Sequence, residues 1–450
     1  MNKQADNLVS NLAQFPDKDG FDADGNQYTS PELVQLRAMN EIYTHVVAGG
    51  KNRIVSEKPC PVNGKAFVFE NPEEFRQQFT HQRKIGNKRP GAAWFDWPGK
   101  NFKQGGIGIY PEPLKCPESV FNLYPGFAIE SAHGDCDIFL RHLKEVLCNG
   151  CDSSYEYLMG WLAHMIQKPE EKPSVAVVLK SVEGTGKGTL FKPLKTILGP
   201  LAVQVNGVEQ ITGKFNSLVA NKLLVFGDEV ELTNRRASNR LKGLISEPSA
   251  TVELKGIDAQ QVPNYARFIF AGNGENMILA GTRERRYLVL EPSAHLAQDK
   301  DYFDTLHRWA GGSGPQALLY LLSNWDLSGF DPRRAPVTYA LIEEKLGNLK
   351  LIDAYLLEQL MSESPFQDAK RLETNYLAGR FRDWAGTQGQ QLSLMQSASP
   401  LGKAMKRIGV NVIGRSDRGD GKRWYEFPEL NVMRANFAES LGHESGEIFE

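Results

Sequence analysis

The sequence has no apolar run long enough to cross a bilayer, and its first residues are polar and acidic, unlike a secretory signal. Cysteines are few, five in 450 residues, which favours a reducing compartment. Basic residues are not in excess either, because 52 Lys and Arg stand against 54 Asp and Glu. These absences argue against a membrane-spanning or disulfide-rich secreted protein and favour a cytoplasmic one. The balanced charge also gives no overall basic surface that would indicate nucleic-acid binding, although a channel or wing can still be locally basic.

The remaining composition is that of a globular protein, with 41% hydrophobic and 24% charged residues, and the length predicts two to four domains. Cys148 and Cys151 form a C-x-x-C pattern, and Cys136, His133 and His142 lie near them in sequence. The spacing matches no familiar zinc finger, so we expect buried structural thiols rather than a zinc site.

The most informative segment is VAVVLKSVEGTGKGT at 175–189, an apolar strand followed by a glycine-rich turn. Gly184 and Gly186 allow several backbone N–H groups to point into one hollow, and a helix starting near Lys187 adds its positive end. Lys187 would reach the β- and γ-phosphate oxygens of ATP. The predicted nucleotide-binding residues are Glu183, Gly184, Thr185, Gly186, Lys187, Gly188 and Thr189.

This phosphate loop departs from the usual G-x-x-x-x-G-K-[ST] pattern. Ser181 occupies the first glycine position, and Gly188 stands where a hydroxyl would hold Mg²⁺. Thr189 either holds the metal one residue late or only caps the helix. Pro193 should disturb that helix. A glycine-rich turn without a ligand is the alternative.

Three later strands carry the remaining phosphate chemistry. KLLVFGDEV (222–230) ends with Asp228, the expected Mg²⁺ holder, and Glu229, the expected base for the attacking water. ARFIFAGN (266–273) ends with Asn273, whose amide can contact the γ-phosphate and the water. TRERRYLVLEP (282–292) supplies Arg285 and Arg286, which could neutralise phosphoryl charge in cis or from a neighbouring subunit. In the alternative interpretation, Asp228 and Glu229 only mark the end of a strand, Asn273 is a turn residue, and the arginines belong to a solvated run of charges.

Flanking segments have simpler patterns. A hairpin is expected around Gly49-Gly50, a capped helix in NPEEFRQQFTHQR, and strands or loops in AAWFDWP and IGIYPEP. Apolar faces at helical spacing predict helices at 136–148 and 154–167. After the helix RASNRLKGLIS, the short strands TVEL and AQQV form a hairpin with Lys255 near its tip.

The C-terminal segment 400–430 reads as a helix, a strand, a Gly/Asp turn and a second strand, as in a winged helix. Residues 403–423 hold seven basic side chains and two acidic ones, which suits phosphate contacts. The expected DNA contacts there are Arg407, Arg415, Lys422 and Arg423. A wing used for protein contact is the alternative.

The order of phosphate loop, Asp-Glu strand, lysine-tipped hairpin and Asn strand with trailing arginines resembles superfamily 3 helicases of the AAA+ class. Phrases such as GTGKGTLFKPLKTILG, GKFNSLVANKLLVFGDE and RERRYLVLEPS resemble the helicase portion of phage and plasmid primase–helicases, over roughly residues 41–340. The resemblance implies a hexameric ring, ATP between subunits and DNA in the central channel. It implies that Arg286, or alternatively Arg285, acts in trans at the ATP site of the neighbouring subunit. It also implies that Lys255 follows the DNA backbone and that helices 136–167 form a collar that holds the ring together.

The fold expected from these observations is an α/β protein with an AAA+ P-loop ATPase core. Its predicted parts are an N-terminal α/β module (1–130), a helical collar (131–170), the ATPase domain (171–340) and a helical linker with a winged-helix-like domain (341–450). Primer synthesis is not expected, because no convincing carboxylate pair lies on an early strand: Asp22/Asp24 and Asp135/Asp137 look like loop residues.

The predicted function is an ATP-dependent DNA helicase for phage or mobile-element replication, using ATP and Mg²⁺. Its expected partners are single-stranded or forked DNA, five further copies of itself, and a separate primase or polymerase in a phage-infected or plasmid-bearing bacterial cell. The first alternative is a replication initiator or loader that uses ATP as an assembly switch. The second is a P-loop kinase of a small substrate.

Overall fold

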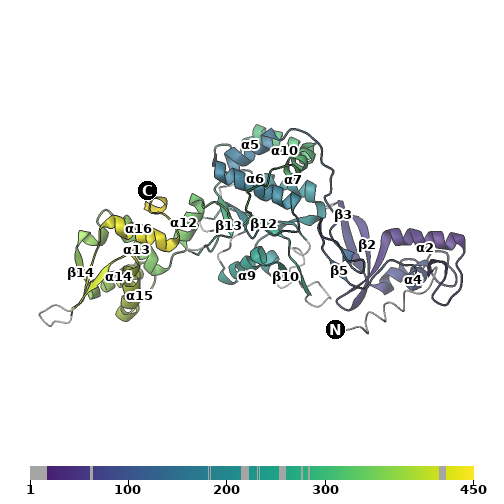
Figure 1. Ribbon diagram of the computed structural model, residues 1–450, viewed down its shortest axis with the longest axis horizontal. Coiled ribbons are helices and arrows are strands. Elements are labelled where there is room, and N and C mark those ends of the chain that lie inside the picture. The colour runs from purple at the N-terminus through teal and green to yellow at the C-terminus, as the bar shows by residue number, and fades with distance from the viewer. Residues whose placement is uncertain are drawn as a thin grey trace.

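The computed structural model describes residues 18–60, 64–180, 182, 184–213, 222–230, 232, 234–252, 260–274, 277–281, 284–414 and 422–449. Three parts follow one another along an elongated molecule, with the N-terminal part at one end and the C-terminal part at the other (Figure 1). Among these residues no helix combines the length and the apolar character that crossing a membrane requires. The predicted domain boundaries stay predictions.

The N-terminal part is built on a four-stranded sheet in the order β3-β2-β1-β4. The predicted hairpin is confirmed, because β1 and β2 pair antiparallel with Ala48 opposite Lys51. The predicted capped helix is also confirmed: the Glu73 amide donates to the Asn71 side chain at 2.9 Å. The elements are α2 (Ser30–Ile42), β1 (Tyr43–Ala48), β2 (Lys51–Cys60), β3 (Gly64–Glu70), α3 (Pro72–Gln77), α4 (Pro90–Asp96), β4 (Phe102–Lys103), β5 (Ile107–Gly108) and β6 (Phe121–Asn122), preceded by a 3₁₀ turn, η1 (Lys18–Gly20).

The prediction of strands or loops for AAWFDWP is wrong, because most of this segment lies in α4. Pro90 begins the helix, where its missing N–H is not needed. Trp94 and Trp97, three residues apart, are both buried against Phe75 and its neighbours. Burial of two large rings on one face thus outweighs the aromatic character that suggested a strand.

The helices predicted for 136–148 and 154–167 are confirmed, with one irregularity. They are α5 (Asp137–Arg141), a π-helix labelled η2 (His142–Leu147), and α6 (Asp152–Gln167). Cys148 is buried as predicted, but Cys151 is exposed, so the prediction of buried thiols is wrong for Cys151. Within the described residues, no three His, Cys, Asp or Glu side chains gather where they could share a metal ion.

The central part is a five-stranded parallel sheet in the order β13-β7-β12-β9-β8. The three strands expected to carry phosphate chemistry are confirmed as β9, β12 and β13. Because every pair is parallel, the carboxyl ends of all five strands meet at one edge, and β7 lies between β13 and β12. The strands are β7 (Ala176–Lys180), β8 (Ala202–Asn206), β9 (Leu224–Asp228), β12 (Arg267–Gly272) and β13 (Tyr287–Leu290).

Helices cover both faces of this sheet. Alternate residues of β7 point to opposite faces. Val177 and Leu179 pack on the side of α6, α7 and α11, and Ala176 and Val178 pack on the side of α9 and α12 (Tyr339–Gly347). Figure 1 shows α6 and α7 on one side and α9 on the other. The helices around the sheet are α7 (Lys187–Leu198), η3 (Gly199–Leu201), α8 (Glu209–Thr212), α9 (Arg235–Ser246), α10 (Lys300–Gly311) and α11 (Gly314–Ser323).

Two details of this part bear on the predictions. The expectation that Pro193 disturbs the helix after the phosphate loop is wrong, because α7 continues through it to Leu198. Leu190, Leu194 and Ile197 are fully buried, so packing outweighs the one backbone hydrogen bond that proline cannot make.

The predicted hairpin is confirmed as β10 (Ser249–Val252) and β11 (Gln260–Pro263), which pair antiparallel.

The C-terminal part contains the predicted helix followed by two antiparallel strands, α15, β15 and β16. A third strand that the sequence did not suggest, β14, pairs with β16. The winged-helix interpretation stays a prediction. The elements are α12 (Tyr339–Gly347), α13 (Leu351–Met361), η4 (Pro365–Asp368), β14 (Arg371–Glu373), α14 (Thr374–Thr387), α15 (Leu394–Arg407), β15 (Asn411–Ile413), β16 (Trp424–Glu426), α16 (Leu430–Leu441) and α17 (Gly446–Phe449).

Candidate functional site

The glycine-rich turn joins the carboxyl end of β7 to the start of α7. Gly184 and Gly186 both have a φ of +80°, a conformation that favours glycine. The helix begins at Lys187, as predicted, so its unpaired N–H groups point towards the turn. Thr185 is buried, and its hydroxyl donates to the Val182 carbonyl at 3.1 Å. Glu183, a further predicted contact, lies outside the described residues.

Gly186 also lies too close to its neighbours for any side chain. A Cβ atom there would come within 2.5 Å of the Phe303 ring and 2.8 Å of the His142 ring. His142 belongs to the π-helix and is fully buried; its Nε2 lies 3.4 Å from the Gly186 carbonyl and its Nδ1 lies 3.1 Å from the Tyr302 hydroxyl. Burial lowers the pKa of His142 from 6.5 to about 4, which keeps the ring neutral at pH 7.

Residues behind the turn were missed by sequence reasoning. His142 reads as an ordinary helical residue, and Tyr302 and Phe303 follow the turn by more than 100 positions. Only the fold brings α10, the π-helix and the turn together. A π-helix is often found next to a functional site, but it leaves no signal in a single sequence.

Gly188 and Thr189 stand in the first turn of α7. Gly188 is exposed, and a Cβ atom there would meet no other atom within 4 Å, so a hydroxyl-bearing residue would fit. Thr189 is 5% exposed, and its amide donates to the Gly186 carbonyl at 3.0 Å. The N-cap position itself belongs to Gly186. The metal-holding role of Thr189 stays a prediction.

Lys187 and Asn273, predicted from segments 86 positions apart, are brought together. The Lys187 ammonium donates to the Asn273 side-chain oxygen and, at 3.3 Å each, to the Gly272 and Val182 carbonyls. Asn273 follows β12, the neighbour of β7, at the carboxyl edge of the sheet. This contact joins the predicted phosphate lysine to the predicted sensor.

Asp228 ends the next strand, β9, and Glu229 follows it directly. Since β12 separates β9 from β7, the two strand ends lie about 10 Å apart, a distance that leaves space for a phosphate chain. The Gln204 side chain donates to the Asp228 carboxylate at 3.1 Å. Glu229 is exposed and has a φ of +51°, an unfavourable conformation for a residue with a Cβ atom. Such strain is typical of functional sites.

Arg285 and Arg286 do not join this group. Arg286 precedes β13, and its carbonyl accepts from the Ala176 amide at the amino end of β7. The phosphate loop begins past Lys180, about 13 Å along the strand. Arg286 is paired at 3.3 Å with the buried Glu284, which also holds Lys242 at 2.8 Å. The two arginines therefore lie at the opposite edge of the sheet from their own phosphate loop.

The predicted DNA contacts are only partly described. Lys255 and Arg415 lie outside the described residues. Arg407 forms an ion pair with Asp353, and Lys422 forms one with Glu373 at 3.3 Å. Arg423 is exposed just before β16. The DNA-binding role of all five residues stays a prediction.

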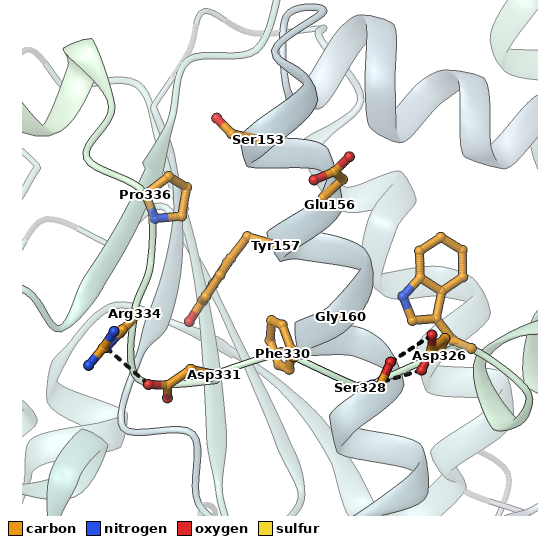
Figure 2. Close-up of a pocket in the computed structure, with 12 residues that line it drawn as sticks. Ser153, Glu156, Tyr157, Gly160, Asp326, Ser328, Phe330, Asp331, Arg334 and Pro336 are labelled. Atoms are coloured by element: carbon orange, nitrogen blue, oxygen red, sulfur yellow. Dashed lines mark hydrogen bonds and ion pairs between the residues drawn. The ribbon is translucent and has the colours of Figure 1, made fainter.

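A separate pocket of about 750 Å³ lies between α6 and the segment 325–336 (Figure 2). Tyr157 donates to the Pro332 carbonyl at 2.6 Å beside it, and Asp331 pairs with Arg334 at 3.2 Å. No loop residue among those that the structure describes lines this pocket. It is therefore not the nucleotide site predicted from the sequence.

Comparison with known proteins gives a family match, a relative in sequence and similar solved structures. Residues 179–286, from the end of β7 to Arg286, match a family of unknown function, DUF5906. Over 249 residues the chain is 24% identical to the DNA primase-polymerase of Nitratiruptor phage NrS-1, covering 53% of this chain and 33% of the relative. The match thus spans a third of the relative's length.

Solved structures extend the likeness over most of the chain. The apo structure of the NrS-1 C-terminal region superposes with a TM-score of 0.63 at 16% identity, covering 89% of this chain and 100% of that one. An A-form apo structure of the same region gives 0.64 at 14% identity, covering 88% and 99%. The chain is therefore related in sequence to a phage primase-polymerase and shares the mixed α/β fold of its C-terminal region.

Proposed function

We propose that this chain is an ATP-hydrolysing motor of the superfamily 3 helicase type, acting on single-stranded DNA in phage-type replication. The observation that carries the proposal is the contact between Lys187 and Asn273 at the carboxyl edge of the sheet, with Asp228 and Glu229 one strand away. Open α/β sheets bind their ligands at this edge. The relation to a phage replication protein supports the biological setting.

The residues fit a triphosphate and its metal. A Cβ atom at Gly184 or Gly186 would clash with Gln298, His142 or Phe303 behind the turn, so glycine is needed at both positions. The N-terminus of α7 favours negative charge in front of the turn. Lys187 would exchange its bonds with Asn273 and two carbonyls for phosphate oxygens. Asp228 would hold Mg²⁺, and the ion would supply positive charge against the phosphate. Glu229 would take the proton of the attacking water, and Asn273 would orient that water.

The arginines complete the site only between chains. About 13 Å of strand separates Arg286 from its own phosphate loop, so we propose that Arg285 or Arg286 serves the loop of a neighbouring copy. This arrangement requires a ring or another assembly with repeated head-to-tail contacts. A hexamer, with the β10–β11 hairpins and their Lys255 residues around a central strand of DNA, is the form that the resemblance suggests.

The experiment that tests this function is ATP turnover with and without single-stranded DNA. We expect Lys187→Ala and Glu229→Gln each to lower turnover on the order of 10²-fold, because they remove charge stabilisation and the base. Lys192→Ala, on the exposed side of the same helix, is the matched control and should leave turnover unchanged. Lys255→Ala should remove DNA stimulation while basal turnover remains.

Other results would favour the rival functions. Slow turnover together with tight, sequence-specific duplex binding would favour an initiator or loader. A monomer whose turnover ignores both DNA and the Lys255 substitution would favour a small-molecule kinase. Absence of any hydrolysis by the wild type would end the motor proposal.

A further inference from the structure

Glu344, on α12, is a fully buried carboxylate that no predicted role accounts for. Its two oxygens accept hydrogen bonds from two successive backbone amides, Met277 at 3.1 Å and Ile278 at 3.0 Å. Its Oε1 also lies 3.5 Å from the ammonium of Lys180, the last residue of β7. A buried charge is expensive unless it is paired in this way, so this position is specific for an acid.

The segment that Glu344 holds is connected to both catalytic strand ends. It follows Asn273 by four residues, and the Met277 carbonyl accepts from the Leu232 amide at 2.7 Å. Leu232 in turn lies three residues beyond Glu229, and Asn348 of α12 donates to the Ile278 carbonyl at 2.9 Å. The exits of β9 and β12 therefore meet at one backbone segment, and α12 fixes that segment.

The same helix belongs to two cores. Ala340 and Leu341 are buried in the cluster on the central sheet, whereas Ile342 is buried in the C-terminal cluster. The ammonium of Lys345, the residue after Glu344, lies 3.0 Å from the Nε2 of His443. The Nδ1 of His443 lies 3.2 Å from the carboxylate of Glu447 in α17. A displacement of the sensor segment would thus move a helix anchored in the C-terminal part.

We infer that Glu344 is a positioning residue that sets the Asn273 segment for hydrolysis and couples the phosphate site to the C-terminal part through α12. The inference rests on the proposed ATPase function. In chemical terms, the carboxylate holds two amides at the exit of β12 while Lys180 fixes it from the exit of β7. Catalysis needs such positions to be held within a fraction of an ångström.

The test compares Glu344→Gln with Glu343→Gln in the full-length chain. Glu343 is the adjacent residue, half exposed, and pairs with the same Lys180 at 3.5 Å, but within the described part of the chain it accepts from no backbone amide. In Glu344→Gln an NH₂ group would face one backbone N–H, so we expect kcat to fall about 10-fold while KM for ATP changes less than about 2-fold. Glu343→Gln should leave both constants unchanged. Equal kcat in the wild type and Glu344→Gln would overturn the inference.

A second variant and a second readout keep the test decisive. If Glu344→Gln does not fold, Asn348→Ala, which loses the hydrogen bonds to the Ile278 and Glu344 carbonyls, should lower kcat about 2- to 3-fold with KM preserved. An unchanged kcat would overturn the inference. Hydrogen exchange without nucleotide should be faster at Met277 and Ile278 in Glu344→Gln than in Glu343→Gln. Equal exchange would contradict the positioning role even if the wild type proves to hydrolyse no ATP.

The coupling is tested separately with Lys345→Met, which removes the contact with His443. Adding a non-hydrolysable ATP analogue to the wild type should change hydrogen exchange at 443–447, and in Lys345→Met that change should be lost while basal turnover remains. Identical exchange responses in the two proteins would contradict the coupling through α12.

Discussion

Two glycines of the phosphate loop, two positions apart, have opposite surroundings. Gly186 lies against His142 and Phe303 with a positive φ, whereas Gly188 faces open space on α7. A side chain is therefore excluded at Gly186 and accepted at Gly188. The fold therefore has space at position 188 for the hydroxyl-bearing side chain of the usual motif, and packing does not explain why that side chain is absent.

We predict that Gly188→Ser folds normally and gains about 0.5 kcal/mol of stability, because serine is the better helix former. If the new hydroxyl helps to hold the metal, the Mg²⁺ concentration for half-maximal turnover should fall several-fold. Gly186→Ser is the matched comparison and should lose about 1–3 kcal/mol through backbone strain, and more through the clash with Phe303. Denaturant unfolding and Mg²⁺ titration of turnover measure both. Similar stability losses in the two variants would contradict this difference between the two positions.

His142 makes the stability of the chain sensitive to mild acid. Its pKa falls to about 4 in the folded chain from 6.5, so between these values the unfolded state binds more protons and the free energy of unfolding decreases as pH falls. The full contribution is present above pH 6.5, and on the order of 3 kcal/mol is lost towards pH 4. His164, whose pKa burial and the nearby Arg267 also lower to about 4, adds to the same slope.

We therefore predict that His142→Gln has a shallower pH dependence of unfolding between pH 6.5 and 4 than the wild type. The exposed His295 provides the control, since His295→Gln should keep the wild-type slope. Urea unfolding at several pH values measures the slope. Equal slopes in all three proteins would show that His142 is accessible to protons in the folded chain.

Between elements, one side chain joins the helix α6 to β12, the strand that leads to Asn273. Arg267 is fully buried, and its guanidinium donates to the carbonyls of Glu171 at 2.6 Å and Lys168 at 2.9 Å, where α6 ends. Burial lowers its pKa to about 9, above neutral pH, so it remains charged there. The end of α6 and the strand that leads to Asn273 are thereby held together.

We predict that Arg267→Met lowers the free energy of unfolding by about 3–5 kcal/mol, because several buried carbonyls lose their donor. Arg240→Met, on the exposed side of α9, should change it by less than about 0.5 kcal/mol. Chemical denaturation of both variants checks this. A loss below 1 kcal/mol for Arg267→Met would mean that water replaces the guanidinium.

Local patterns predicted most of these elements, but not their meeting points. The apolar runs ending in Asp228 and Asn273 gave the strands, because buried parallel strands have continuous apolar sequences. AAWFDWP and Pro193 misled because tertiary packing overrides local propensity. Glu344 could not be found from sequence: 71 positions separate it from Asn273, and an acid on an amphipathic helix usually faces water.

Across the whole molecule, the separation of the arginines from their own phosphate loop predicts complementation between chains. A Lys187→Ala chain keeps its arginines, and an Arg285→Ala/Arg286→Ala chain keeps its loop. Each alone should be inactive, but an equal mixture should recover up to about a quarter of wild-type turnover, because one contact in four joins an intact loop to intact arginines. ATP turnover after mixing measures this. No recovery in a mixture shown to co-assemble would place the chemistry within one chain.

Because α12 packs in both the central and the C-terminal cores, it limits where this protein can be divided into fragments. A recombinant fragment ending before α12 would remove Ala340 and Leu341 from the sheet and leave the Met277 and Ile278 amides without their carboxylate. We expect such a truncation to be poorly soluble and to say little about the intact chain. Fragments intended for crystallisation or screening should therefore extend at least through Asn348, so that α12 still packs on the sheet.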